Sequence, residues 1–238
     1  MIVKGMIATK ALIEGNKREV LEVILRKGKS DKDSHYLIKL LNERAIPYSY
    51  MDKEAFYDEY GKDSGATVAI CKQRNSDSLE ALFRNDVIFY LDGIEDPYNL
   101  GFCLRTLCAF GFSSVLTSHR DYKDSEAIIL RSSAGAYDKI NLLNSENSYL
   151  DLKEIKDKGY KLLALERSDE SLDLFKAPLS GKICLLLGGE KRGINKEILN
   201  LCEHKIVIPY GSSFRNALSA VSACDVVATI AFERRRDD

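Results

Sequence analysis

Apolar runs alternate with segments of helical periodicity from about residue 86 to the end of the chain. The runs VIFYLDGI, SSVLTS, YKLLALE, KICLLLGGE and HKIVIPY are rich in Val, Ile and Leu, and the segments between them carry apolar residues at helical spacing. Strands that are apolar on both faces are typical of a parallel sheet with helices on each side. The pattern therefore predicts an α/β fold built on a parallel sheet.

The first part of the chain has the pattern of a separate, smaller α/β unit. VLEVILR, YSYMD and ATVAICK predict strands, whereas SHYLIKLLNERAI predicts a helix with apolar residues on one face. The stretch QRNSDSLEALFRND that follows is polar and only weakly helical, which is typical of a linker. We therefore expect a small domain over residues 1–75, a linker over residues 76–85 and a second domain over residues 86–238.

Three loops in the second domain are candidate ligand sites, because ligands of parallel sheets bind where loops leave the carboxyl ends of the strands. These loops are EDPYNLG after the first long strand, GGEKRG after Leu187, and PYGSSFRNALS after Val207. Each combines Gly with polar residues and leads into a segment of helical pattern. We expect the three loops to converge at one edge of the sheet.

The first loop contains residues with both a structural and a chemical interpretation. Asn99 is placed to cap the helix that follows, and Gly101 permits another chain or a ligand to approach closely. Arg105 falls away from the apolar stripe that includes Leu100 and Leu104. It is therefore either a solvated side chain or a guanidinium held near phosphate or developing negative charge. Periodicity does not decide between these two roles.

Composition and charge argue against several classes of protein function. The net charge of −1 argues against a protein that coats nucleic acid by bulk charge, although a local basic patch is enough to bind RNA. The six Cys form no C-x-x-C pair and the three His lie at no metal-ligand spacing, so we expect reduced thiols, a cytoplasmic protein and no metal. The chain also lacks the long apolar run of a membrane span and the apolar core of a secretory signal.

Taken together and in this order, the three loops resemble the motifs of the SpoU/TrmH group of the SPOUT superfamily, which are RNA ribose 2′-O-methyltransferases that use S-adenosylmethionine. The element RSSAGA, residues 131–136, is also similar to a family element. The matching positions are Asn99, Gly101, Arg105 and Thr106 in the first motif, Gly188, Glu190 and Gly193 in the second, and Ile208, Pro209, Gly211, Phe232 and Glu233 in the third. The third motif departs from the family pattern, since Ser219 or Ser222 stands where the family has Asn.

The resemblance implies a fold and a set of partners. The sheet is expected to carry a deep trefoil knot in its C-terminal portion, and the preceding small α/β domain to bind the RNA substrate, a tRNA or an rRNA. Family members are homodimers with their sites at the interface, so a homodimer is expected here. The cofactor S-adenosylmethionine is expected to be held by backbone groups of the second and third loops, at Leu187, Gly188, Gly189, Ile208, Pro209 and Leu218.

The resemblance also assigns catalytic roles. Arg105 is expected to stabilise the alkoxide that develops at the ribose 2′-oxygen, because an arginine is seldom deprotonated and is a poor base. Asn99 is expected to orient Arg105 or the ribose. Glu190 is expected to shape the cofactor loop, or to bind Arg192 or a residue of the partner. Ser219 or Ser222 is expected to hydrogen-bond near the reacting oxygen.

Two other interpretations stay open at this point. A SPOUT-like dimer that binds RNA without transferring methyl groups is one, because the segment RNALSAVS departs from the third motif. An ordinary doubly wound enzyme acting on a small molecule is the other. The chain lacks both the dinucleotide pattern G-x-G-x-x-G and the phosphate pattern G-x-x-x-x-G-K-[ST], which disfavours this last reading.

Overall fold

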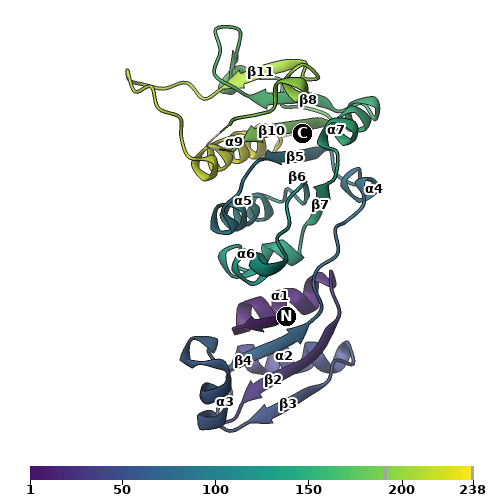
Figure 1. The fold of residues 1–238 in the computed structure, drawn as a ribbon, viewed down its shortest axis with the longest axis vertical. Coiled ribbons are helices and arrows are strands. Elements are labelled where there is room, and N and C mark those ends of the chain that lie inside the picture. The colour runs from purple at the N-terminus through teal and green to yellow at the C-terminus, as the bar shows by residue number, and fades with distance from the viewer. Residues whose placement is uncertain (190–191, 237–238) are drawn as a thin grey trace.

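The structure, a computed structural model, describes residues 1–189 and 192–236. The described strands form one sheet of four strands and one of seven. The two sheets lie toward opposite ends of an elongated molecule, and the first part of the chain forms the four-stranded sheet (Figure 1).

The smaller sheet has the strand order β1-β4-β2-β3. Strand β4 pairs antiparallel with β1 and β2, and β2 pairs parallel with β3. Helices α1 and α2 cover one face around buried Leu12 and Leu37, and α3 packs on the other face through Phe56. The elements are β1 Ile2–Lys4, α1 Met6–Gly15, β2 Val20–Arg26, α2 Lys32–Glu43, β3 Tyr48–Met51, α3 Lys53–Tyr60 and β4 Thr67–Cys71.

The larger sheet has the strand order β7-β6-β5-β10-β8-β11-β9, and all of its strand pairs are parallel. The parallel sheet predicted from the apolar runs is therefore confirmed. The strands are β5 Val87–Asp92, β6 Ser114–Ser118, β7 Asn141–Ser145, β8 Lys161–Leu165, β9 Leu172–Asp173, β10 Ile183–Gly188 and β11 His204–Val207.

Helices cover both faces of this sheet (Figure 1). Three of them, α5, α6 and α9, pack on one face, and α4, α7 and α8 pack on the other. None of the helices in the described residues is both long and apolar enough to cross a membrane. The helices are α4 Leu79–Leu82, α5 Pro97–Ala109, α6 Glu126–Ser132, α7 Ser148–Asp157, α8 Lys196–Leu199 and α9 Ala220–Arg234.

Helix α5 begins earlier than predicted, and its cap is a different residue. The Asp96 side chain accepts a hydrogen bond of 2.7 Å from the Tyr98 amide, and Pro97 occupies the first helical position. Asn99 therefore lies inside the helix, and the prediction that it caps α5 is wrong. A cap at Asp96 leaves the Asn99 side chain available for another contact.

Gly101 allows helices α5 and α6 to pack closely. A Cβ atom at Gly101 would lie 1.9 Å from the Ser132 hydroxyl oxygen, which is far inside van der Waals contact. The close neighbour predicted for this glycine is therefore another helix of the same chain. Ser132 belongs to the segment 131–136, so two elements of the resemblance meet here.

A buried group of charged residues joins the two sheets. The Arg18 guanidinium, which is fully buried, donates to both Asp138 carboxylate oxygens at 3.0 and 2.8 Å and to Glu126 at 2.8 Å. Arg74 donates to Asp77 at 2.6 Å beside it. Helix α1 is closely packed against the same place, since a Cβ atom at Gly15 would lie 1.8 Å from the Asp138 carbonyl oxygen.

Replacing Arg18 with alanine is expected to lower the free energy of unfolding by about 3–5 kcal/mol, because it removes the cation that hydrogen-bonds to both buried carboxylates. Urea unfolding followed by circular dichroism measures this. Lys4→Ala is the matched control, since its ion pair with Asp63 is exposed and is worth about 1 kcal/mol or less. Equal losses for the two variants would contradict a structural role for the buried group.

The segment 76–85, predicted as a linker, is packed against the larger sheet. The Asp77 amide donates to the Leu142 carbonyl at 3.0 Å, and the Asp77 carboxylate accepts from the Leu142 amide at 2.8 Å. Leu82 is fully buried. The polar composition of the segment 76–85 is thus that of a surface segment that is hydrogen-bonded to β7.

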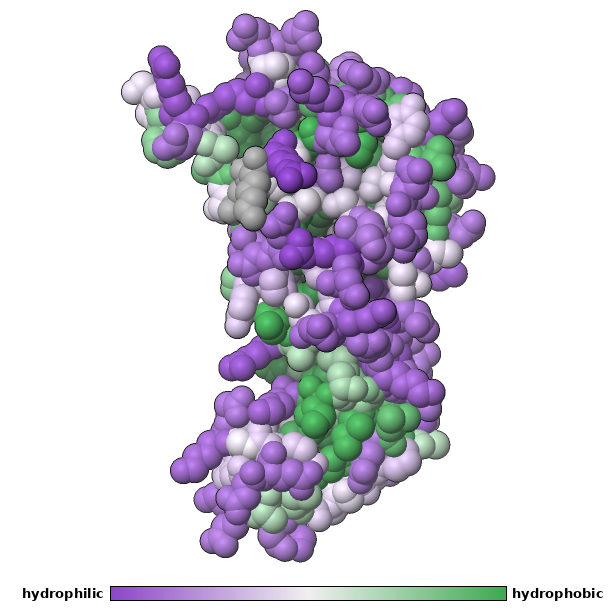
Figure 2. Space-filling view, viewed as in Figure 1, coloured by the Kyte–Doolittle hydropathy of each residue, from purple (hydrophilic) through white to green (hydrophobic). Residues whose placement is uncertain are grey.

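The smaller sheet is incompletely covered by its helices. Hydrophobic residues gather on this end of the molecule in the view of Figure 2, whereas the end with the seven-stranded sheet is mostly hydrophilic on that face. Ile2 on β1 and Leu21 on β2 are 49% and 43% exposed.

All six cysteines are free thiols, as predicted. Burial raises the pKa of Cys71 and Cys184 and raises the pKa of Cys202 to about 12. A raised pKa keeps these thiols protonated and unreactive near neutral pH.

Candidate active site

The first cavity lies at the carboxyl edge of the larger sheet. It has a volume of about 330 Å³ and is bounded by the ends of β8, β10 and β11 and by the start of α9. The second and third predicted loops meet here. Four of the six residues predicted to hold the cofactor line it: Gly188, Gly189, Ile208 and Leu218.

The other two predicted cofactor residues are not part of this lining, since Leu187 is buried and Pro209 is exposed. Leu187 is 2% exposed and belongs to the hydrophobic core, and Pro209 stands between the lining residues Ile208 and Tyr210. Neither residue is among those that line the first cavity.

The glycine pair at the end of β10 is required by the protein backbone. A Cβ atom at Gly189 would lie 2.3 Å from the Gly93 carbonyl oxygen, and one at Gly188 would lie 2.5 Å from the Gly193 carbonyl carbon. The Gly193 amide donates to the Gly189 carbonyl at 3.1 Å, which closes the loop on itself. A side chain at Gly189 would therefore collide with the loop after β5, and one at Gly188 with Gly193 of its own loop.

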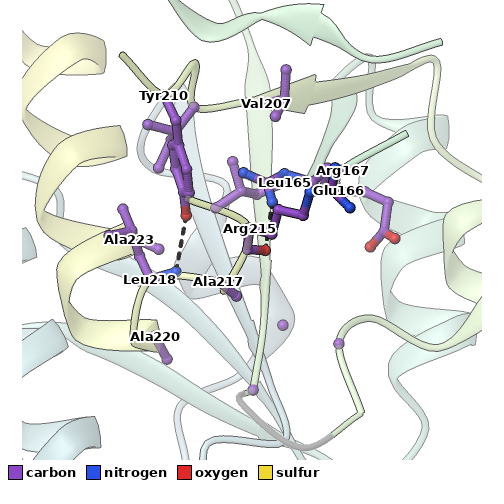
Figure 3. Close-up of a pocket in the computed structure, with 14 residues that line it drawn as sticks. Leu165, Glu166, Arg167, Val207, Tyr210, Arg215, Ala217, Leu218, Ala220 and Ala223 are labelled. Carbon is purple, nitrogen blue, oxygen red and sulfur yellow. Dashed lines mark hydrogen bonds between the residues drawn. The ribbon is translucent and has the colours of Figure 1, made fainter. Parts of the chain in front are cut away.

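Part of the cavity wall comes from a loop that the sequence analysis did not single out, the one that follows β8. Arg167 of this loop lies over the Tyr210 ring, 4.4 Å from its centroid, and donates to the Arg215 carbonyl at 2.7 Å (Figure 3). The Leu218 amide donates to the Tyr210 hydroxyl at 3.1 Å. These contacts tie the loops after β8 and β11 together.

A second cavity, also of about 330 Å³, adjoins the first. Gly189 and Ala220 line both of them. Asn99 from the first predicted loop lines the second cavity, and Arg120 from the loop after β6 lies at the same cavity. The three predicted loops therefore do converge at one edge of the sheet, with Asn99 beside the glycine loop.

Arg105 does not join them. It is exposed on α5 and lines neither the first nor the second cavity. It follows Asn99 by six residues, which corresponds to about 9 Å along the helix. The expected placement of this guanidinium beside the glycine loop is thus not found within the single chain.

The two candidate serines have a structural role at the start of α9. Ser219 caps the helix, and its hydroxyl oxygen accepts from the Ser222 amide at 3.1 Å. The two hydroxyls are also 3.0 Å apart, and both side chains are exposed. Neither lines the first or second cavity. The last candidate, Glu190, lies outside the described residues.

Comparison with known families identifies the family of the larger domain. The model of the SpoU rRNA Methylase family matches residues 86–228. The chain belongs to the SpoU rRNA methylase family. This confirms the family predicted from the three motifs.

Several known methyltransferases are similar to this chain over most of its length. The 23S rRNA (guanosine-2′-O-)-methyltransferase RlmB of Pasteurella multocida is 26% identical over 216 residues, which cover 88% of each chain. The SpoU methyltransferase AviRb from Streptomyces viridochromogenes has the same fold, with a TM-score of 0.81, 18% identity and coverage of 100% of this chain and 90% of that one. The AviRb structure in complex with AdoMet gives a TM-score of 0.78, 19% identity and coverage of 100% and 91%.

In this SpoU methylase the helix that carries Arg105 packs against α9. The Thr106 hydroxyl donates to Asp225 at 2.6 Å, and the Phe110 and Phe232 rings are 5.3 Å apart between centroids. Apolar side chains are exposed on both helices, with Phe102 at 42% and Phe232 at 39%. Arg105 therefore belongs to a helix pair that presents apolar side chains to solvent.

Proposed function

We propose that this chain transfers the methyl group of S-adenosylmethionine to the ribose 2′-hydroxyl of ribosomal RNA. The proposal rests on one observation. The glycine loop after β10, the loop after β11 and Asn99 meet at two adjoining cavities. Family membership supports the reaction class. The choice of rRNA rests on the RlmB relative, which acts on 23S rRNA and matches this chain through both its N-terminal and C-terminal parts.

The first cavity has the size and chemistry to hold the cofactor. Its volume of about 330 Å³ is within the range of pockets that bind small molecules. Leu165, Val207 and Ile208 offer an apolar wall for an adenine ring, and Glu166 and Arg215 add polar groups. When bound there, S-adenosylmethionine supplies a methyl group already activated on a sulfonium.

The residues of the chain then have to position and assist the ribose. Holding the 2′-oxygen in line with the methyl group supplies much of the rate. We assign the second cavity to the target nucleotide, because it adjoins the first at Gly189 and Ala220. Asn99 would orient the ribose there. Ser219 and Ser222 would act only indirectly, by fixing the start of α9 beside the cavities.

We also propose a homodimer in which a second copy covers the exposed face of α5 and α9. Phe102 and Phe232 would be buried by such a contact. Arg105 would then reach the second cavity of the other copy and stabilise the developing alkoxide. This arrangement explains how a residue of the first motif can be catalytic although it lines neither the first nor the second cavity of its own chain.

We further infer that the C-terminal part is threaded as the deep trefoil knot that the resemblance implies. Strand β11 pairs with β8, beyond β10, and α9 then returns to pack on α5. The segment 208–219 must therefore cross back along the edge of the sheet.

A methyl-transfer assay tests the proposed function. The purified protein with radiolabelled S-adenosylmethionine is expected to label rRNA from cells that lack this gene and not rRNA from cells that have it. Mapping the 2′-O-methyl sites in the two RNA samples identifies the nucleotide. A protein that binds rRNA tightly and transfers no methyl group would instead support the RNA-binding module without catalysis.

A further inference from the structure

A third cavity lies beside the second, at the carboxyl ends of β6 and β7. It has a volume of about 390 Å³, and its walls come from the segment 74–76, the loop 117–123 and the end of β7. Arg120 lines both the second and the third cavity. The three cavities therefore lie in a row along one edge of the sheet, the first two sharing Gly189 and Ala220 and the last two sharing Arg120.

The wall between the second and third cavities is firmly held. The Tyr122 hydroxyl donates to the Ile94 carbonyl at 3.1 Å, which ties the loop after β6 to the loop after β5. Burial raises the pKa of Tyr122 to about 12, so the hydroxyl remains a donor at neutral pH. Asn144 accepts from the Arg120 amide at 3.1 Å and donates to the Arg120 carbonyl at 2.7 Å. The backbone from which Arg120 projects is therefore fixed before any ligand binds.

The inner charges of the third cavity neutralise one another. Glu126 accepts from Arg18 at 2.8 Å and from the Tyr137 hydroxyl at 3.3 Å. Arg74, whose side chain is 2% exposed, is paired with Asp77. The inner wall thus presents neither excess cation nor excess anion to a ligand.

The outer rim is different, because two cations there have no acidic partner. Among the described residues Arg120 and Lys123 form no ion pair, and both side chains are exposed. The rim also has two carboxylates. Glu146 lies 3.2 Å from His119, and Asp121 accepts from the Lys123 amide.

We propose that the third cavity binds a nucleotide adjacent to the methylated one along the RNA strand. The inference rests on the proposed function, which places the methyl donor in the first cavity and the target ribose in the second. A row of cavities suits a linear polymer, and unpaired bases are typically recognised by hydrogen bonds and by stacking on aromatic or guanidinium planes. Arg120 and Lys123 provide the charge for the phosphate that connects the two nucleotides, and the exposed side-chain amide of Asn75 lies at the same cavity.

The test compares two charge reversals. Lys123→Glu alters the rim of the third cavity, whereas Lys153→Glu alters an exposed lysine on α7 that lines none of the described cavities. Both change the net charge equally, so bulk repulsion of RNA is matched. With rRNA from cells lacking the gene, Lys123→Glu is expected to raise the KM for RNA about tenfold or more. Its kcat and its affinity for S-adenosylmethionine should stay within about twofold of the wild type.

The control and a milder variant decide the interpretation. Lys153→Glu should leave the KM within about twofold of the wild type. Lys123→Gln, checked for folding by circular dichroism, should give a smaller rise in KM and reduce the slope of binding against salt by roughly 0.7–0.9, the value for one lost phosphate contact. Equal behaviour of Lys123→Glu and Lys153→Glu in a protein that methylates rRNA would overturn the third cavity as a nucleotide site and leave the proposed function standing. A wild-type protein that neither binds nor methylates rRNA would overturn both.

Discussion

Replacing Arg105 with alanine is expected to lower the kcat for methyl transfer by roughly 100- to 1,000-fold, which is the cost of removing one group that stabilises a developing oxyanion. The affinity for S-adenosylmethionine should stay nearly unchanged, because Arg105 lies outside the first cavity. Single-turnover methylation of rRNA measures the first quantity and isothermal titration the second. An active Arg105→Ala protein would remove this residue from the mechanism.

Mixed dimers distinguish between the two possible origins of the guanidinium. One copy carries Arg105→Ala, and the other carries a change that blocks its own first cavity. If Arg105 acts across the interface, a mixed dimer contains one complete site formed by the cofactor cavity of the first copy and the arginine of the second. Its activity should approach half that of the wild type. If Arg105 acts within its own chain, the mixed dimer stays inactive.

Most of the larger sheet could be predicted because its strands are apolar on both faces and therefore stand out from the helices between them. The first two elements of the chain, β1 and α1, were missed. Strand β1 has only three residues, and its pairing with β4 depends on a segment more than sixty residues away. Helix α1, MIATKALIEG, has the apolar Ile7 on its exposed face and the polar Thr9 on its buried face. A helix of this kind lacks the periodic signal that reveals an amphipathic one.

The sequence predicts only those parts of the site that lie on loops with a recognisable composition of their own. The loops after β5, β10 and β11 contain glycines and polar residues next to apolar strands, and all three do meet. The loop after β8 was missed because its role depends on strand order. Strand β8 lies between β10 and β11, so Glu166 and Arg167 at its end reach the first cavity. The position of Arg105 likewise cannot follow from periodicity, which gives its face on α5 but not what covers that face.

Replacing Gly189 with alanine is expected to disable the cofactor cavity. The new methyl group would lie 2.3 Å from the Gly93 carbonyl oxygen, so the loops after β5 and β10 must separate. Such overpacking costs about 1–3 kcal/mol. If the separation of these loops distorts the cofactor cavity, the dissociation constant for S-adenosylmethionine rises roughly 5- to 150-fold. Isothermal titration measures the dissociation constant, and thermal unfolding measures the part of the strain that appears as lost stability.

Gly211→Ala is the matched control, because it makes the same chemical change in the loop after β11. A Cβ atom at Gly211 would have no heavy atom within 4 Å, so this variant should bind S-adenosylmethionine as the wild type does. The contrast separates two explanations of a glycine-rich site. If glycine is needed for flexibility, both substitutions should weaken binding. If it is needed for the close approach of two backbones, only Gly189→Ala should do so, and equal weakening in the two variants would contradict the packing at Gly93.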